Sequence, residues 1–378
     1  MKDKKIGIIT FHNSYNCGSM LESYAIQTFV NKNIGETEII DYSSDGQKEL
    51  YSVFERNNSI KKIIKNILIL PHYKQILLNN KKYEEFKVKN FTLSDSVSEN
   101  NINDEKYKAV VAGSDQIWNV TILDFNEVYL LPWVKKAKKI AYSPSFGAKN
   151  PLKFYEKKDE LIKMLRDFDA LSIREYNGQK WINDMLNIKV PVLLDPTLLL
   201  EAKDYDQIED KEFDPKYKYI FFYSPGFNRK ICRFVKKIAD KYNLKVITWS
   251  TKSYYIKNIK EFGFILPPYE SPAVYLHLIK NAELVLTTSY HGTIFSTIYK
   301  KRFFTIKNGG MYGDDDRVKT LLEQINMQKN LIPYEFDDNF NYLQNINYNN
   351  YDIKLSDLKI KSIKFLKDNL SEDKDENN

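Results

Sequence analysis

The histidine at position 291 stands in the stretch of sequence best suited to chemistry. Small hydroxyl residues follow an apolar run, and His291, Gly292 and a helical pattern come next (LVLTTSYHGTIFST). Backbone N–H groups at a helix start, together with the hydroxyls of Ser289 and Thr293, can bind phosphate oxygens, and Gly292 lets an anion come close. A helix N-terminus disfavours imidazolium, so we expect a neutral His291. The alternative is structural: the hydroxyls cap the helix and the histidine has an internal partner.

Two arginines could bind the same anion. Arg174 ends the apolar run LSIRE, and its guanidinium can donate two parallel bonds to a carboxylate or phosphate. Arg174 could equally form an internal pair, near Glu175 or with Asp195. Arg317 follows three aspartates that suit helix capping better than metal binding. It either turns toward a cleft or stays in solvent.

A polar loop follows the first apolar run of the chain (HNSYNCGS). Asn16, Gly18 and Ser19 lie there at a helix start, so we expect them to contact a ligand. Cys17 could be a nucleophile activated by the helix dipole, but a passive small residue is the simpler interpretation. No G-x-G-x-x-G follows a strand here and no P-loop motif occurs, so a dinucleotide cofactor and a P-loop nucleotide are not expected.

Further polar groups follow two more apolar runs. Gly113 and Ser114 leave the backbone accessible, and Asp115 offers a carboxylate to a ligand hydroxyl (VVAGSDQIWN). Ser143 closes the next run (AYSPSFG). Because the carboxyl ends of parallel strands meet at one edge of a sheet, we expect all these loops to face one ligand.

The elements that must position these residues are short apolar strands alternating with helical patterns. In the first half the predicted strands are residues 5–11, 37–42, 109–112, 140–143, 171–174 and 190–194. In the second half they are residues 219–223, 245–250, 284–288 and 303–306. The pattern predicts an α/β protein with two Rossmann-like domains that face each other across a cleft.

Changes in composition predict the domain boundaries. We expect an N-terminal domain over residues 1–200 with a helical insertion at about 48–105, a linker over 201–217, a C-terminal domain over 218–354, and a helix with an acidic tail over 355–378. In residues 59–91 one helix face carries Ile60, Ile63, Ile64, Ile67 and Leu68, with lysines around them. That face either packs inside the protein or contacts the inner surface of a membrane peripherally, and both interpretations stay open.

Composition narrows the class of protein. Of 378 residues 43% are hydrophobic, with 27 Tyr and 22 Phe, which excludes disorder for most of the chain. The formal charge of +7 suits anionic ligands, but the lysines are scattered, so nucleic acid is not an expected partner. Two cysteines without zinc spacing, no signal-peptide pattern and no long apolar run predict a cytoplasmic protein without a metal or other cofactor.

Six motifs in order resemble the polysaccharide pyruvyl transferase family: N-x-G-S with MLESYAIQ, then GSDQIWN, SPSFG, SIRE, LLDPT and SYHG. The resemblance runs from Ile6 to about Leu322. It implies a glycosyltransferase-B-like fold and transfer of a pyruvyl group from phosphoenolpyruvate to hydroxyls of a cell-envelope or exopolysaccharide precursor, as a cyclic ketal. The saccharide, free or lipid-linked, would bind on the N-terminal side and the donor on the C-terminal side.

The resemblance also suggests roles. His291 would transfer the proton and Asp115 would orient or deprotonate the acceptor. Asn16 and Ser19 would hold the acceptor, and the two arginines with the helix start at 291 would hold the donor. We interpret the Asp195–Pro196 turn as a structural bend. The alternatives are a glycosyltransferase that uses a nucleotide sugar and a carbohydrate-binding protein without catalytic activity.

Overall fold

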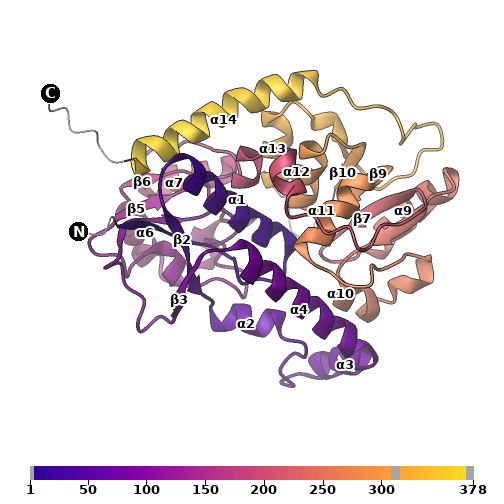
Figure 1. The fold of residues 1–378 in the computed structure, drawn as a ribbon, viewed down its shortest axis with the longest axis horizontal. Helices are drawn as coiled ribbons and strands as arrows, with labels where there is room; N and C mark the ends of the chain where they lie inside the picture. Colours follow the sequence, from indigo (N-terminus) through magenta and orange to yellow (C-terminus); the bar gives the residue numbers. More distant parts are fainter. Residues whose placement is uncertain (1–3, 308–315, 372–378) are drawn as a thin grey trace.

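The computed structural model describes residues 4–307 and 316–371, which form two parallel sheets with helices on their faces (Figure 1). The first sheet has the order β3-β2-β1-β4-β5-β6 and the second β11-β10-β9-β7-β8. The strands of the first sheet are β1 (Lys5–Ile9), β2 (Thr37–Tyr42), β3 (Leu93–Val97), β4 (Tyr107–Ala112), β5 (Lys138–Ala141) and β6 (Ala170–Leu171). Those of the second are β7 (Tyr219–Tyr223), β8 (Lys245–Thr248), β9 (Leu284–Thr287), β10 (Phe303–Ile306) and β11 (Leu331–Ile332). All pairs within the two sheets are parallel, so the expected class of two Rossmann-like units is confirmed.

Helices connect the strands and cover the sheets (Figure 1). The first half contains α1 (Cys17–Asn33), α2 (Asp45–Tyr51), α3 (Ile60–Ile69), α4 (Tyr73–Asn90), α5 (Pro151–Phe154), α6 (Lys158–Arg166) and α7 (Tyr176–Leu186). The second half contains α8 (Ala202–Asp206), α9 (Arg229–Lys241), α10 (Thr251–Ile256), α11 (Pro272–Asn281), α12 (Tyr290–Ile298), α13 (Asp316–Gln324) and α14 (Asn349–Leu370). Short 3-10 helices occupy Leu70–His72, Glu127–Leu130, Pro196–Leu199, Ile259–Phe262 and Gln328–Asn330.

Two sheet predictions were wrong in detail. Residues 190–194 do not join the sheet as a full strand, because Pro191 lacks an N–H; only an isolated parallel bridge joins Val192 to Ile173. Residues 93–97 were assigned to the helical insertion, yet they form the edge strand β3 beside β2. Their sequence, LSDSV, is polar because an edge strand is largely exposed, and so it lacks the apolar pattern of the inner strands.

Each sheet with its covering helices forms one lobe, the first lobe around β1–β6 and the second around β7–β11. Contacts join the two lobes in two places. The start of α14 lies against the second lobe, where the Tyr351 hydroxyl bonds to Thr297 Oγ1 at 3.3 Å. Further along, Ser362 Oγ of the same helix accepts the Leu194 N–H of the first lobe at 3.1 Å. On the other side, the side chain of Asn79 on α4 donates to Thr251 and accepts from the Glu270 backbone. The expected domain limits stay predictions, and the acidic tail from residue 372 lies outside the described residues.

Candidate active site

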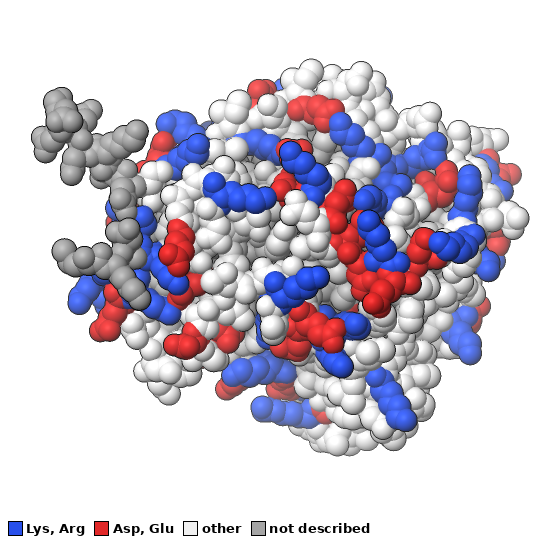
Figure 2. All heavy atoms as spheres, in the orientation of Figure 1, with Lys and Arg blue, Asp and Glu red and all other residues white. Residues whose placement is uncertain are grey.

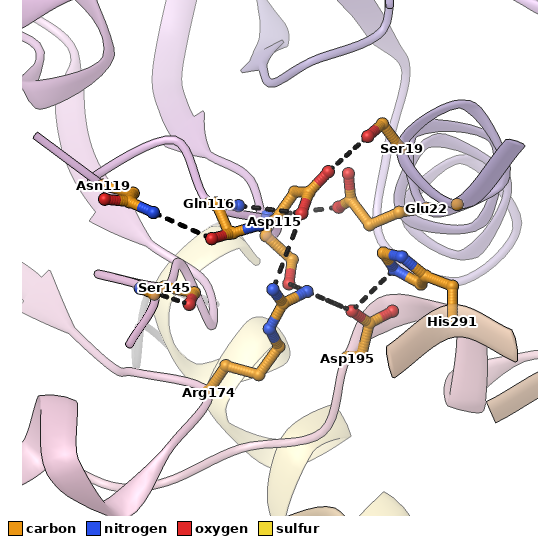
Figure 3. A network of polar contacts seen from close by, with 12 residues as sticks. Ser19, Glu22, Asp115, Gln116, Asn119, Ser145, Arg174, Asp195 and His291 are labelled. Atoms are coloured by element: carbon orange, nitrogen blue, oxygen red, sulfur yellow. Dashed lines mark hydrogen bonds and ion pairs between the residues drawn. The ribbon is translucent and has the colours of Figure 1, made fainter. Parts of the chain in front are cut away.

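Charged side chains from strand ends of the first lobe meet a histidine of the second lobe (Figure 3). Arg174 Nη1 donates to Asp195 Oδ2 at 2.6 Å, and its Nη2 lies 3.6 Å from Asp115 Oδ1. His291 Nε2 lies 3.3 Å from Asp195 Oδ2. Ser19, at the start of α1, donates to Asp115 Oδ2 at 2.5 Å. The expected convergence of these loops on one place is therefore present, with Asp195 at its centre.

The starts of α1 and α12 meet at this cluster. Asn16 caps α1 by accepting the Gly18 N–H, and Ser289 caps α12 by accepting the Gly292 N–H. Gly18 touches the His291 ring so closely that an added Cβ would lie 2.2 Å from Nδ1. A glycine at position 18 is thus required for the histidine to stand between the two lobes.

The backbone of Asp115 is held in an unusual conformation. Its φ is +68°, in the left-handed region that non-glycine residues seldom adopt. Oδ1 accepts the Gln116 N–H at 2.8 Å, and Oδ2 accepts the Ser19 hydroxyl. Strain of this kind persists where the surroundings fix it, and it is common at functional sites.

The cluster is buried, and its charges control one another. Burial raises the pKa of Asp115 and of Asp195, but the positive charges of His291 and Arg174 outweigh this effect and leave both pKa values below normal. Glu22, on the inner face of α1, has the opposite balance: burial and the negative charges of Asp195 and Asp115 raise its pKa well above normal. We therefore expect two ionised aspartates beside a protonated Glu22.

Several donors in the cluster have no hydrogen-bond partner within the described part of the chain. They are His291 Nε2, Arg174 Nε and Arg174 Nη2. His291 Nε2 is within ion-pair distance of Asp195, but the alignment is too poor for a hydrogen bond. An unsatisfied buried polar group costs about 1–3 kcal/mol, and more when it is charged. The cluster therefore suits a ligand that brings acceptor oxygens.

A tyrosine ring connects the cluster to Arg317. The guanidinium carbon of Arg174 lies 4.4 Å from the centre of the Tyr290 ring, and that of Arg317 lies 5.9 Å from the same centre. Burial raises the pKa of Glu175 to about 7, although the positive charges of both arginines lower it. Arg317 is thus on the site side of α13. Asp314 and Asp315 of the adjoining acidic run lie outside the described residues.

Some expected ligand groups have structural partners instead. Ser289 is the α12 cap, and the Thr293 hydroxyl bonds to Ser289 O and Thr305 Oγ1. An added Cβ at Gly292 would lie 2.2 Å from Thr287 Oγ1, so this glycine allows the helix to pack on β9. Proximity to a helix start does not distinguish a hydroxyl that caps the helix from one that binds a ligand, and here the capping alternative matches the bonds present.

Of the small residues predicted to bind a ligand in the first lobe, some lie in the cluster and one only packs against its neighbours. Gly113 packs against Thr10, with an added Cβ 3.0 Å from Thr10 Cβ. Ser114 Oγ donates to Ser143 O at 2.8 Å, and Arg174 Nη1 lies 3.4 Å from the same Oγ. Ser143 has a positive φ of 44°, and its buried hydroxyl has no partner among the described residues. Ser114 and Ser143 therefore belong to the cluster, whereas Gly113 supports it.

Sequence reasoning missed two carboxyl groups of the site. Asp195 was interpreted as part of a bend, and it does cap the turn by accepting Thr197 N–H and Oγ1–H. Its other oxygen bonds to Arg174 and faces His291. Glu22 accepts from Thr10 Oγ1 and from the Ser114 N–H. A carboxylate inside the apolar pattern MLESYAIQ was the available signal for Glu22.

Beside the cluster, both lobes line a cavity of about 400 Å³. Its wall combines aromatic rings with amide, hydroxyl and charged groups. The first lobe contributes Tyr15, Asn16, Tyr51, Asn79 and Tyr83, and the second Tyr223, Trp249, Lys252 and Glu270. Asn16 connects the cavity to Gly18 and so to His291. Cys17 also lines it, but burial raises the pKa of its thiol well above normal, so an activated nucleophile is not supported.

A sequence model described as polysaccharide pyruvyl transferase matches residues 16–310 of the chain. The chain belongs to the polysaccharide pyruvyl transferase family. It is therefore a transferase, and the motifs that suggested the family contribute Ser19, Asp115, Arg174, Asp195 and His291 to one cluster. No curated protein sequence matches the chain significantly.

Solved structures of similar architecture have low sequence identity to this family member. UDP-GlcNAc 2-epimerase from Neisseria meningitidis bound to UDP-GlcNAc has 11% identity and a TM-score of 0.48, covering 95% of this chain and 99% of its own. The Rickettsia bellii UDP-N-acetylglucosamine 2-epimerase has 14% identity and a TM-score of 0.47, and the match covers 96% of this chain and 95% of the epimerase chain. E. coli heptosyltransferase WaaC with ADP-2-deoxy-2-fluoro heptose has 10% identity and a TM-score of 0.37, and the match covers 82% of this chain and 91% of the heptosyltransferase chain. All three TM-scores are below 0.5.

Two properties of residues 4–307 and 316–371 bear on metals and membranes. None of their His, Cys, Asp and Glu side chains form a group of three that could hold a metal ion. No helix among them is both long and apolar enough to cross a membrane.

Proposed function

We propose that this transferase moves the pyruvyl group of phosphoenolpyruvate onto two hydroxyls of a saccharide precursor of an envelope or exopolysaccharide, as a ketal. The observation that carries the proposal is the set of buried N–H groups on Arg174 and His291 that lack hydrogen-bond partners among the described residues. Phosphoenolpyruvate has a phosphate and a carboxylate, so it supplies the acceptor oxygens that these donors need. Arg317, whose guanidinium carbon lies 5.9 Å from the centre of the Tyr290 ring, offers a second cation for the same dianion.

The proposed reaction begins with a proton. His291 delivers it to the methylene carbon of the enol, which leaves a cationic centre at the carbon that carries the phosphate. Asp195 stays ionised, since its pKa is lowered, and its carboxylate stabilises the imidazolium form of His291 before the transfer.

The two hydroxyls then add in turn. Asp115 accepts the proton of the first hydroxyl as its oxygen bonds to the cationic carbon, and Ser19 orients the Asp115 carboxylate. The carbon–oxygen bond to phosphate breaks, and the second hydroxyl closes the ring. Of the two hydroxyl protons, one replaces the proton used on carbon and the other leaves with phosphate, so the reaction balances without a redox partner.

The interlobe cavity is the proposed site of the saccharide. Sugar rings stack on aromatic faces and bond to amides and carboxyl groups, and the wall offers both kinds of group. Burial raises the pKa of Glu270 to about 7, against the bonds it accepts from Thr251, so this carboxyl can either donate to or accept from a hydroxyl near neutral pH. Asn16 at the inner end of the cavity would hold the acceptor next to Asp115.

The experiment that tests the proposal measures phosphate release from phosphoenolpyruvate with a panel of saccharides. A product heavier than the saccharide by one pyruvate less water is the expected result. In parallel, thermal unfolding is followed with phosphoenolpyruvate or with UDP-sugars, because a ligand at 100 times its Kd stabilises the native state by about 2.7 kcal/mol. Stabilisation by UDP-sugars alone would favour a glycosyltransferase, and saccharide binding without turnover would favour a binding protein.

A further inference from the structure

The helix α3 is turned the opposite way from a typical surface helix. Surface helices bury their apolar stripe and expose the polar face. In α3 and the residue after it, the exposed apolar side chains are Ile60, Ile63, Ile64, Ile67, Leu68 and Leu70, which we call the α3 face. Ile60 is 77% exposed and Ile67 is 63% exposed. The packing alternative considered from the sequence is therefore wrong for these residues.

The polar side of α3 faces the protein and has partners there. Lys62 pairs with Glu49 at 3.1 Å, and Lys65 pairs with Glu55 at 2.9 Å. Asn66 donates to the Glu55 carbonyl and accepts the Glu55 N–H. These bonds set the rotation of the helix, so the exposed apolar face is built into the fold.

The charges beside this face that form no ion pair with a described residue are positive. Residues 57–83 contain six lysines and no aspartate or glutamate. Lys61 and Lys74 are exposed, and neither forms an ion pair with another described residue. Elsewhere on the drawn face of the molecule acidic and basic side chains are mixed, whereas the surface over α3 is largely uncharged with separate Lys or Arg side chains (Figure 2). An apolar face rimmed by lysines is complementary to an anionic lipid surface.

We propose that the α3 face docks this protein on an anionic membrane surface, with the isoleucines in the headgroup–acyl boundary and Lys61 and Lys74 on lipid phosphates. Because α4 follows α3 directly and lines the interlobe cavity through Ile76 and Asn79, docking would bring the cavity toward the bilayer. The ligand class is then a saccharide carried by a lipid. This last step rests on the proposed function, whereas docking itself does not.

The test measures co-sedimentation with vesicles of phosphatidylcholine and phosphatidylglycerol in equal amounts, and with phosphatidylcholine alone. We expect binding to the anionic vesicles that weakens with salt. The double variant Ile64→Ser/Ile67→Ser should bind at least ~10-fold more weakly, since about 1 kcal/mol or more of burial is lost at each position. Lys61→Glu/Lys74→Glu should also lose at least ~10-fold, at about 1 kcal/mol per lysine.

The helix α14 offers matched controls, because Ile353 and Ile360 are each 63% exposed, like Ile67, and Lys354 and Lys361 are exposed too. Ile353→Ser/Ile360→Ser and Lys354→Glu/Lys361→Glu should bind as the wild type does. Equal losses in these controls, or no binding of the wild type, would overturn the proposal. So would a wild-type dimer in light scattering that Ile64→Ser/Ile67→Ser converts to a monomer, since a second copy would then cover the face.

Activity on a water-soluble saccharide without vesicles separates this proposal from the function. The α3 variants should keep that activity, and thermal unfolding should show that they fold. Vesicle binding without any pyruvyl transfer would refute the function and leave docking intact. Pyruvyl transfer without vesicle binding would refute docking and leave the proposed function intact.

Discussion

The starts of α1 and α12 have similar sequences and different roles. Each follows a parallel strand, and each places a glycine and hydroxyl residues at a helix N-terminus. At α1 an asparagine caps the helix, which leaves Ser19 free to donate to Asp115. At α12 the Ser289 and Thr293 hydroxyls bond within the second lobe, whereas His291 reaches the site and the Tyr290 ring lies beside Arg174. The same local pattern thus supplies an oxygen donor in one lobe and an imidazole in the other.

The largest effect should come from Asp195, which links His291 of α12 to Arg174 and, through Arg174, to Asp115 beside the start of α1. Asp195→Asn would leave Arg174 and His291 without their buried counter-charge. Removing one partner of such a pair typically costs about 3–5 kcal/mol. We expect a loss of that size in the free energy of unfolding in urea, together with loss of turnover. Stability and kcat close to the wild type would show that Asp195 is only a bend.

His291→Ala tests whether α12 contributes chemistry. Loss of general acid–base catalysis costs about 10²–10⁴ in kcat, and the fold should remain because the ring stands between the two lobes, against Gly18 and Asp195. Phosphate release and circular dichroism together measure this. A variant with normal kcat would remove His291 from the mechanism.

Gly18→Ala tests the contact between the two helix starts. The new Cβ would lie 2.2 Å from His291 Nδ1, so the ring must move, and a displacement of about 1 Å can cost ~10² in rate. Gly35→Ala is the matched control, since its Cβ meets only Ile6 Cδ1 at an ordinary 3.8 Å. Equal kcat values in the two variants would contradict the close contact.

Glu22 is a buried carboxyl on α1, and its effect depends on pH. Its pKa is raised in the folded state, so the folded protein binds more protons than the unfolded chain above the ordinary glutamate pKa of about 4.3. Stability should therefore fall as pH rises above that value. Urea unfolding of Glu22→Gln should show a weaker fall over the same range. An unchanged pH dependence would mean that Glu22 is ionised in the fold.

The smallest effect should separate capping from binding. Ser289→Ala removes the α12 cap and should cost about 1 kcal/mol of stability, with little change in the KM for phosphoenolpyruvate. Ser19→Ala should cost stability too, because the buried Asp115 carboxylate loses a donor, but unlike Ser289→Ala it should also lower kcat. Thermal unfolding and steady-state kinetics distinguish the two, and a raised KM in Ser289→Ala would restore its hydroxyl as a phosphate ligand.

Much of the fold could be predicted because its signals are local. The strands β2, β7 and β10 have the predicted limits, since continuous apolar runs mark buried parallel strands. The strand β3 was not predicted, because an edge strand needs little apolar surface. Residues 190–194 were predicted as a strand, but Pro191 interrupts their pairing with the sheet. In the site, His291, Arg174 and Asp115 were found from strand ends, but Asp195 was not, because its cap bonds to Thr197 give it a complete local explanation.

Local apolar patterns are enough to define the two parallel sheets and the strand ends that carry the polar side chains, because such patterns act over a few residues. The folded arrangement of the two lobes was needed to show that His291 meets Asp195 and Gly18, since these contacts join residues of different lobes. It also decided which way the amphipathic α3 faces. Periodicity shows that a helix has an apolar side, but its rotation depends on partners such as Glu49 and Glu55, and these bonds turn the isoleucines outward.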